Sequence, residues 1–119
     1  MARVVALFDD LLLGSNVLGL LRAGGHEVAL VADASAVAPE GADVLVVDLG
    51  TDGFDGVAVA ERLRAAGELG GTRLLGVYSH VHHDVKLRAE GAGFDLVVPR
   101  SRLAREGAAL VDRLTASGG

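Results

Sequence analysis

The sequence predicts an α/β domain in which helices cover both faces of a parallel β-sheet. The main evidence is the segment from Ala42 to Gly56, ADVLVVDLGTDGFDG, where residues 44–47 form an uninterrupted apolar run. A short run without polar alternation is typical of a strand that is buried on both faces. The second observation is that strand-like and helix-like segments alternate along the chain, which indicates βα units.

Four further segments have the composition of strands, and they predict the topology of the sheet. Right-handed crossovers and the common flavodoxin-like order, 2-1-3-4-5, place the first strand beside the central third strand. We therefore expect a flavodoxin-like (βα)5 doubly wound parallel sheet. The four strands expected beside the central one are residues 3–8, 27–32, 73–78 and 96–98.

Apolar residues at spacings of three and four predict the helices. The first helix ends at the Gly24-Gly25 stop signal. The second is degenerate, because Pro39 and Gly41 interrupt residues 35–41 after about one turn. Ser101 is the expected N-cap of the last helix. The apolar stripes of the four full helices are Leu13, Val17, Leu20 and Leu21; Val59, Leu63 and Ala66; Val81, Val85, Ala89 and Ala92; and Leu103, Leu110, Val111 and Leu114.

Length, charge and composition limit the classes of function. The 119 residues are enough for one domain, which we expect over residues 1–116 with a frayed tail at 117–119. The net charge of −5 argues against a nucleic-acid partner. The absence of cysteine excludes disulfides and thiolate metal sites, and it is compatible with a cytoplasmic location. Only five apolar residues, Val4 to Phe8, stand between Arg3 and Asp9, too few for a signal peptide or a membrane span.

The predicted strand order brings carboxylates together at one edge of the sheet. Asp48 ends the central strand, and Asp9 or Asp10 ends the neighbouring first strand. Converging carboxylates repel one another unless they bind a cation, share protons or are screened by water. Mg²⁺ suits a site with one or two carboxylates, and an Asp carboxylate can also attack phosphorus. The alternative is that these acids are solvated loop residues.

The segment DLGTDGFDG, residues 48–56, resembles the phosphoacceptor loop of bacterial response-regulator receiver (CheY-like) domains. Asp48, Gly53, Asp55 and Gly56 fall in the matching places, whereas Asp52 replaces the usual proline. The resemblance extends along the chain through the acidic end of the first strand, a hydroxyl residue after the fourth strand and a Gly-Ala pair before the fifth.

The resemblance implies roles for several of these residues. It implies that Asp48 accepts a phosphoryl group and that Asp48 with Asp9 or Asp10 holds Mg²⁺. It also implies that Ser79 moves toward the phosphate and reports its presence. His80 directly follows this switch position.

The sequence departs from the receiver pattern at three places. Of the acidic pair expected after the first strand, Phe8 and Asp9 stand in the two positions, so that only one is acidic. The lysine expected before the proline of the fifth strand is replaced by Val98, and Arg100 two residues further on is the candidate substitute cation. Asp95 stands where an aromatic switch residue is usual. The sequence therefore indicates a divergent receiver.

Three functions remain open. The favoured interpretation is a stand-alone, non-enzymatic receiver-like module that acts through a protein partner or as a homodimer, because Val98 argues against phosphorylation at Asp48. The second is a Mg²⁺-dependent phosphoacceptor of a two-component system, whose partner would be a histidine kinase. The third is a nucleotide- or flavin-binding domain, although no Gly-x-Gly-x-x-Gly follows the first strand.

Two surfaces and one histidine cluster complete the predictions. By resemblance, the partner face is built from the fourth helix, fifth strand and fifth helix, where Arg88, Arg102 and Arg105 lie. Leucines 11–13 cannot all face the core, so that one or two would be exposed as a second partner surface or as isolated leucines. His80, His82 and His83 with Asp84 would either ligate Zn²⁺ or open the fourth helix as solvated residues.

Overall fold

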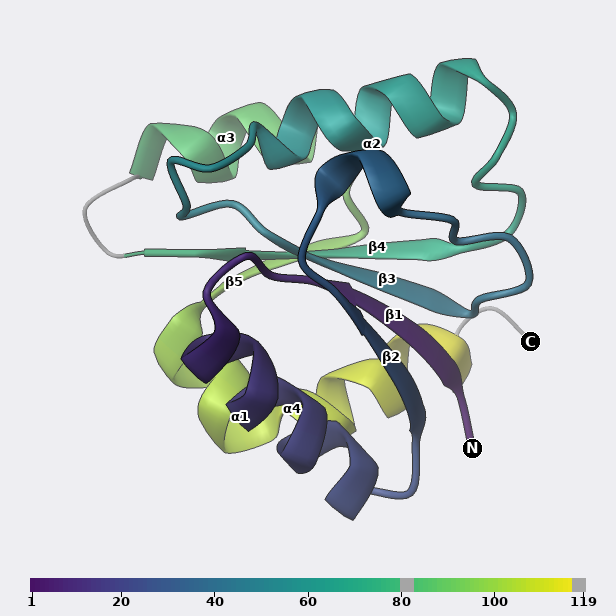
Figure 1. The fold of residues 1–119 in the computed structure, drawn as a ribbon, viewed down its shortest axis with the longest axis vertical. Helices are drawn as coiled ribbons and strands as arrows, with labels where there is room; N and C mark the ends of the chain where they lie inside the picture. The colour runs from purple at the N-terminus through teal and green to yellow at the C-terminus, as the bar shows by residue number, and fades with distance from the viewer. Residues whose placement is uncertain (80–82, 117–119) are drawn as a thin grey trace.

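The protein has a five-stranded parallel sheet between two layers of helices (Figure 1), as seen in a computed structural model that describes residues 1–79 and 83–116. The strand order is β2-β1-β3-β4-β5, and every neighbouring pair is parallel. The predicted flavodoxin-like topology is thus confirmed. The strands are β1 Arg3–Leu7, β2 Glu27–Val31, β3 Val44–Asp48, β4 Arg73–Tyr78 and β5 Leu96–Pro99.

The helices divide between the two faces of the sheet. Figure 1 shows α1 and α4 on one face and α2 and α3 on the other. Alternate side chains of each buried strand point to opposite faces, so each layer has its own apolar core. The helices are α1 Leu11–Ala23, α2 Gly56–Ala65, α3 His83–Gly91 and α4 Arg100–Ala116.

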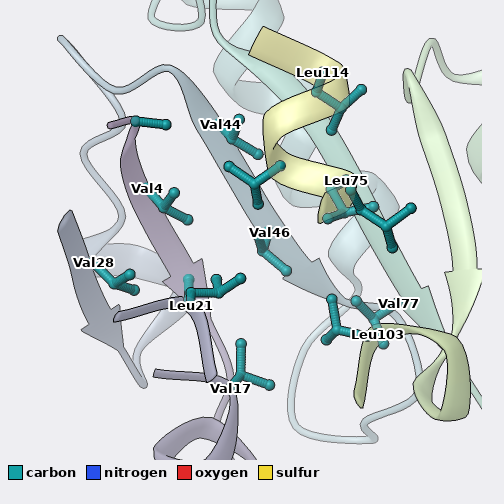
Figure 2. Packing of buried hydrophobic residues seen from close by; sticks show 14 of the residues in the cluster. Val4, Val17, Leu21, Val28, Val44, Val46, Leu75, Val77, Leu103 and Leu114 are labelled. Atoms are coloured by element: carbon teal, nitrogen blue, oxygen red, sulfur yellow. The ribbon is translucent and has the colours of Figure 1, made fainter. Parts of the chain in front are cut away.

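The central strand β3 is buried along its whole length. Val44 and Val46 point into the layer of α1 and α4, where they meet apolar side chains of β1, β4 and both helices (Figure 2). Leu45 and Val47 point into the layer of α2 and α3. Fully burying one such side chain contributes about 1.5–3 kcal/mol to folding. The apolar run of the sequence therefore predicted this strand correctly.

The second helix is degenerate, as predicted, but it lies slightly earlier than residues 35–41. It is a single 3-10 turn, η1, at Ala34–Ala36. Asp33 begins the turn by accepting the N–H of Ser35 on its side chain at 2.9 Å. The chain then passes through Gly41, whose φ of +82° favours glycine.

Two details of the other helices differ from the prediction. Helix α4 begins at Arg100, directly after the strand, so that Ser101 lies inside its first turn and is not the N-cap. Ala66 is exposed at the end of α2, where Val57 and Ala60 join Val59 and Leu63 in the core. The end of the helix explains the second difference, because α2 stops at Ala65 and Ala66 is its C-cap. Val81 of the predicted fourth-helix stripe and the tail at 117–119 lie outside the described residues.

Within residues 1–79 and 83–116, none of the helices has both the length and the apolar character that crossing a bilayer requires.

A buried histidine connects the start of β1 to α4. The side chain of His26 is 3% exposed. Its Nδ1 accepts the backbone N–H of Ala2 at 3.1 Å. Its Nε2 lies 3.3 Å from the carbonyl oxygen of Ala108 and 3.0 Å from Oδ1 of Asp112. Because Nδ1 is an acceptor, the hydrogen-bond network assigns the proton of the neutral ring to Nε2.

We predict that His26→Leu lowers the free energy of unfolding by about 1–3 kcal/mol, because it leaves the buried N–H of Ala2 without an acceptor. Urea denaturation followed by circular dichroism measures this change. Asp112→Ala is the matched control, because it removes only the exposed partner of the ring and should cost less than about 1 kcal/mol. The prediction is wrong if the two variants lose the same stability.

Candidate functional site

Asp48 is a fully buried carboxylate at the carboxyl end of β3. Its Oδ1 accepts the backbone N–H of Gly50 at 2.9 Å. Nη2 of Arg100 lies 3.4 Å from Oδ1 and 3.4 Å from Oδ2. An isolated buried charge would be costly, so this hydrogen bond and this ion pair are what allow the carboxylate to remain in the core.

The environment of Asp48 acts on its ionisation in both directions. Burial, the largest cause, raises the pKa of Asp48 above its ordinary value. The N–H of Gly50 and the positive charge of Arg100 oppose this rise, whereas the negative charge of Asp9 adds to it. Because the net direction is upward, the folded protein holds a proton on Asp48 more readily than the unfolded chain does.

Asp9 stands next to Asp48 because β1 and β3 are paired, with Leu7 opposite Val47. Its Oδ2 accepts the hydroxyl of Thr51 at 2.8 Å, and Oγ1 of Thr51 accepts the N–H of Gly53 at 3.0 Å. A Cβ added at Gly53 would collide with Oδ2 of Asp9. The β3–α2 loop is therefore folded against Asp9, and a side chain at residue 53 would displace the Asp9 carboxylate from this position.

Asp10 has a different role from its neighbour. It is the N-cap of α1, and its Oδ1 accepts the N–H groups of Leu12 and Leu13, each at 3.0 Å. The preceding Phe8 is fully buried in the core between the sheet and α1 and α4. The carboxylate of Asp10 is thus engaged by the helix that it begins, and its role as the alternative to Asp9 in holding Mg²⁺ stays a prediction.

Receiver domains in general bind Mg²⁺ at their phosphorylation site, and the residues present here do not fit that ion. Both oxygens of Asp48 face Arg100, and Oδ2 of Asp9 accepts the hydroxyl of Thr51. A guanidinium in contact with Asp48 already supplies the positive charge that a divalent cation would bring.

The cation comes from α4 and not from β5. Val98 is fully buried in the core between the sheet and α1 and α4, so this strand position offers no charge to the site. Arg100, the first residue of α4, reaches Asp48 instead. The buried Nε–H of Arg100 has no hydrogen-bond partner among the described residues. Such a donor costs free energy, and the contact of Nη2 with Asp48 is the favourable interaction of this guanidinium that opposes the cost.

Gly50 allows this contact. A Cβ added there would lie 3.1 Å from Nη2 of Arg100 and 3.3 Å from the backbone nitrogen of Ser79. Ser79 and Arg100 therefore both lie against the same side of Gly50, at the edge of the sheet where Asp48 ends β3. The sequence singled out Ser79 and Arg100, but not Gly50 or Thr51. The only available signal for these two was their place in the loop directly after Asp48.

The predicted basic face is divided between the two layers. Nη2 of Arg88, on α3, lies 2.7 Å from Oδ2 of Asp55, the N-cap of α2. This contact lowers the pKa of Asp55 and raises that of Arg88. On α4, Arg102 lies 3.4 Å from Glu106, and Arg105 is exposed. Helices α3 and α4 cover opposite faces of the sheet, but both contact the edge strand β5, so the partner face that joins Arg88 with Arg102 and Arg105 stays a prediction.

The histidine cluster is mostly outside the described residues. His80 and His82 fall in the gap at 80–82, and only the backbone of His83 is described, as the first residue of α3. Asp84 lies in the first turn of α3, where an acid is favourable. The zinc hypothesis and the switch role of His80 stay predictions.

A hollow of about 380 Å³ lies between the β3–α2 loop and α3. Leu49, Phe54 and Val85 contribute apolar walls, and the Asp55–Arg88 ion pair lies at its edge. These two charges neutralise each other, and the remaining charged residue of the lining is the acidic Asp52, which would disfavour an anionic ligand.

Comparisons with known proteins identify the fold. No protein-family model matches the sequence, and no curated protein matches it. The receiver domain of the Francisella response regulator 1452 superposes with a TM-score of 0.85 at 16% identity, covering 100% of both chains. A response regulator receiver domain from Clostridium thermocellum gives 0.84 at 14% identity, over 98% of this chain and 96% of that chain.

A third similar structure is the signal receiver domain of NarL from Mycobacterium tuberculosis, with a TM-score of 0.76 at 25% identity over 95% of both chains. The chain therefore has the CheY-like receiver fold of response regulators. The resemblance based on the loop at residues 48–56 is confirmed at the level of the fold.

We predict that Asp10→Ala lowers the free energy of unfolding by about 0.5–2 kcal/mol, because α1 loses its N-cap. Urea denaturation with and without Mg²⁺ measures the loss, which should not depend on the ion. Asp10→Asn is the control, because an asparagine also accepts the two N–H groups and should retain most of the stability. A loss that appears only with Mg²⁺ present would instead assign Asp10 to a metal site.

Proposed function

We propose that this chain is a receiver-like signalling module that acts by binding a protein partner and is not switched by phosphorylation of Asp48. The observation that carries the proposal is the contact of the buried Asp48 with Arg100, 3.4 Å from each carboxylate oxygen. An aspartate that attacks phosphorus needs a free oxygen directed toward the donor. Here both oxygens face the guanidinium, and Oδ1 also accepts the N–H of Gly50.

The substitution at the fifth strand supports the same conclusion. A receiver's lysine would stabilise the phosphoryl oxygens electrostatically. Val98 is apolar and fully buried, so the described residues offer Arg100 in its place, and Arg100 is engaged with the carboxylate itself. The site is therefore arranged to neutralise the Asp48 carboxylate and not to stabilise a phosphoryl group on it.

The competing function is a Mg²⁺-dependent phosphoacceptor served by a histidine kinase. The placement of Asp48 at the end of β3 and of Ser79 beside Gly50 favours it, since both occupy the edge where the chemistry would occur. The nucleotide or flavin alternative is weaker, because Arg88 of the hollow beside α3 is paired with Asp55 and the remaining charge there is the acidic Asp52, so no free cation faces a phosphate.

Binding of a partner needs a surface, and we place it on α4 around Arg102 and Arg105. Arginine is enriched at interface hot spots and forms bidentate bonds with carboxylates. Such a surface fits an acidic protein or a second copy of this chain, whose net charge is −5. The same acidic balance argues against nucleic acid, and a cytoplasmic partner is in keeping with a chain that has no cysteine.

A second surface is the start of α1, where Leu11 and Leu12 are 67% and 75% exposed. Two adjacent exposed leucines would add apolar area to an interface. They lie next to Asp9 and Asp10, so this surface is acidic and differs in chemistry from the arginine surface of α4.

We predict that the wild-type protein incubated with Mg²⁺ and acetyl phosphate gains no phosphoryl adduct, because Arg100 holds both oxygens of Asp48. Intact mass spectrometry measures the adduct, with a competent receiver domain treated in parallel to show that the donor is active. Asp48→Asn is the matched control. An adduct on the wild type that Asp48→Asn abolishes would establish the phosphoacceptor function instead.

We predict that Arg102→Glu with Arg105→Glu weakens self-association or partner capture, because it reverses the charge of the α4 surface. Light scattering and a pull-down with the intact protein measure the two effects. The melting temperature should change little, since an exposed i,i+4 pair such as Arg102–Glu106 contributes only about 0.3–0.5 kcal/mol.

The comparison variant for this experiment is Leu11→Ser with Leu12→Ser, which alters the other exposed surface. If the leucine variant loses binding while the arginine variant behaves as the wild type, the interface lies on α1. The surface assignment to α4 would then be wrong, although the interaction function would stand.

A further inference from the structure

The Asp48 site raises a question of charge. Two carboxylates lie at one edge of the sheet, Asp48 fully buried and Asp9 close enough to repel it. Such a pair requires a counter-charge or a shared proton. The described residues that touch Asp48 supply one positive group, the guanidinium of Arg100.

We infer that Arg100 is the resident cation of this site, that it occupies the position which a divalent cation would need, and that the folded protein is therefore insensitive to Mg²⁺. The inference deepens the proposed function and rests on it, since a site closed in this way is not set up for Mg²⁺-dependent phosphoryl transfer. The inference is about Arg100, which belongs to α4 and not to the fifth strand, where the receiver lysine would be.

The geometry of the contact supports the assignment. One nitrogen, Nη2, is 3.4 Å from both oxygens of Asp48, so it lies on the plane that bisects the carboxylate. A cation bound to both oxygens would have to approach along the same plane. Gly50 borders this position, because even a methyl group there would come within 3.1 Å of Nη2. The guanidinium would thus compete with such a cation for Asp48.

The place of Arg100 in the chain supports it independently. Arg100 is the first residue of α4, and a positive charge at a helix N-terminus is unfavourable, because the N-terminal end of the helix dipole is itself positive. No acidic residue in the first turn of α4 offsets this charge. The charge of Arg100 is offset instead by Asp48, which lies 52 residues earlier in the chain. Arg100 is therefore a positioning residue that joins Asp48 to the start of α4.

A thermal-shift titration tests the inference. Wild type and variants are melted in MgCl2 and, separately, in NaCl of equal ionic strength. We expect the wild-type melting temperature to be the same in both salts. We expect Arg100→Gln to gain a Mg²⁺-specific rise that grows with the logarithm of the Mg²⁺ concentration, because Asp48 and Asp9 then lack a counter-charge and a ligand that binds only the folded state stabilises it.

Two matched variants separate charge from shape. Arg100→Lys keeps a positive charge and should remain insensitive to Mg²⁺. Arg100→Gln combined with Asp48→Asn should lose the gain, because the buried carboxylate is gone. A Mg²⁺-specific rise in the wild type, or no rise in a folded Arg100→Gln protein, would overturn the inference.

A second measurement on the wild type does not depend on how any variant folds. Added Mn²⁺ broadens the NMR signals of nuclei close to it, and we expect no preferential broadening of the Gly50 and Thr51 amides. Preferential broadening there would overturn the inference, and if no phosphoryl adduct formed in the acetyl phosphate assay, the proposed function would still stand. If the protein gains a phosphoryl adduct but does not respond to Mg²⁺ or Mn²⁺, the proposed function is wrong. The link between that function and the Asp48–Arg100 contact is then wrong as well.

Discussion

The structure depends on the burial of β3 on both faces. This strand lies in the middle of the sheet between β1 and β4, and both helix layers cover it. Its side chains must therefore be apolar whichever way they point, which is why Val44 to Val47 show no polar alternation. The other strands and the two pairs of helices are arranged around this requirement.

The same burial determines the chemistry of the edge. Asp48 continues β3 by one residue and remains as buried as the valines before it. Among the described residues, it and His26 are the polar or charged side chains that are buried. The ring nitrogens of His26 are paired with backbone groups and Asp112, whereas the carboxylate of Asp48 requires a positive counter-charge. Arg100 and the loop beginning at Gly50 are folded to provide it.

The glycines of this loop are a consequence of that packing. A Cβ at Gly53 would strike Asp9, and one at Gly56 would lie 2.7 Å from Cγ1 of Val47. The loop has to cross directly over the end of β3 before α2 can begin at Gly56. Its glycine content therefore reflects the close approach of backbone to side chains, whatever chemistry the site performs.

The sequence was sufficient to predict the fold, because hydrophobic runs and helical spacing are properties of whole segments. It was less informative about features that depend on a single residue, such as a helix start or the partner of one carboxylate. Serine is a common N-cap residue, yet α4 starts at Arg100, before Ser101, because β5 runs directly into the helix. Asp9 and Asp10 are chemically identical neighbours, and only the course of the backbone assigns one to the loop and the other to the α1 N-cap.

The partners of Asp48 were predictable to different degrees for the same reason. Strand order brings Asp9 to Asp48, so their proximity followed from the topology. The contact of Arg100 depends on the direction of one side chain at a helix start, which spacing along the sequence does not specify. Thr51 had no periodic pattern to mark it, because its hydroxyl meets Asp9 through the conformation of an irregular loop.

The position of the positive charge determines which secondary-structure element interacts with Asp48. A cation at Val98 would belong to β5, which is held in the sheet by its pairing with β4. The cation at Arg100 belongs instead to α4, the 17-residue helix that packs against α1 and β4. Asp48 therefore interacts directly with the first turn of α4. Any change that removes the negative charge of Asp48 would act first on Arg100 at the start of that helix. Arg102 and Arg105 of the proposed partner surface follow two and five residues later.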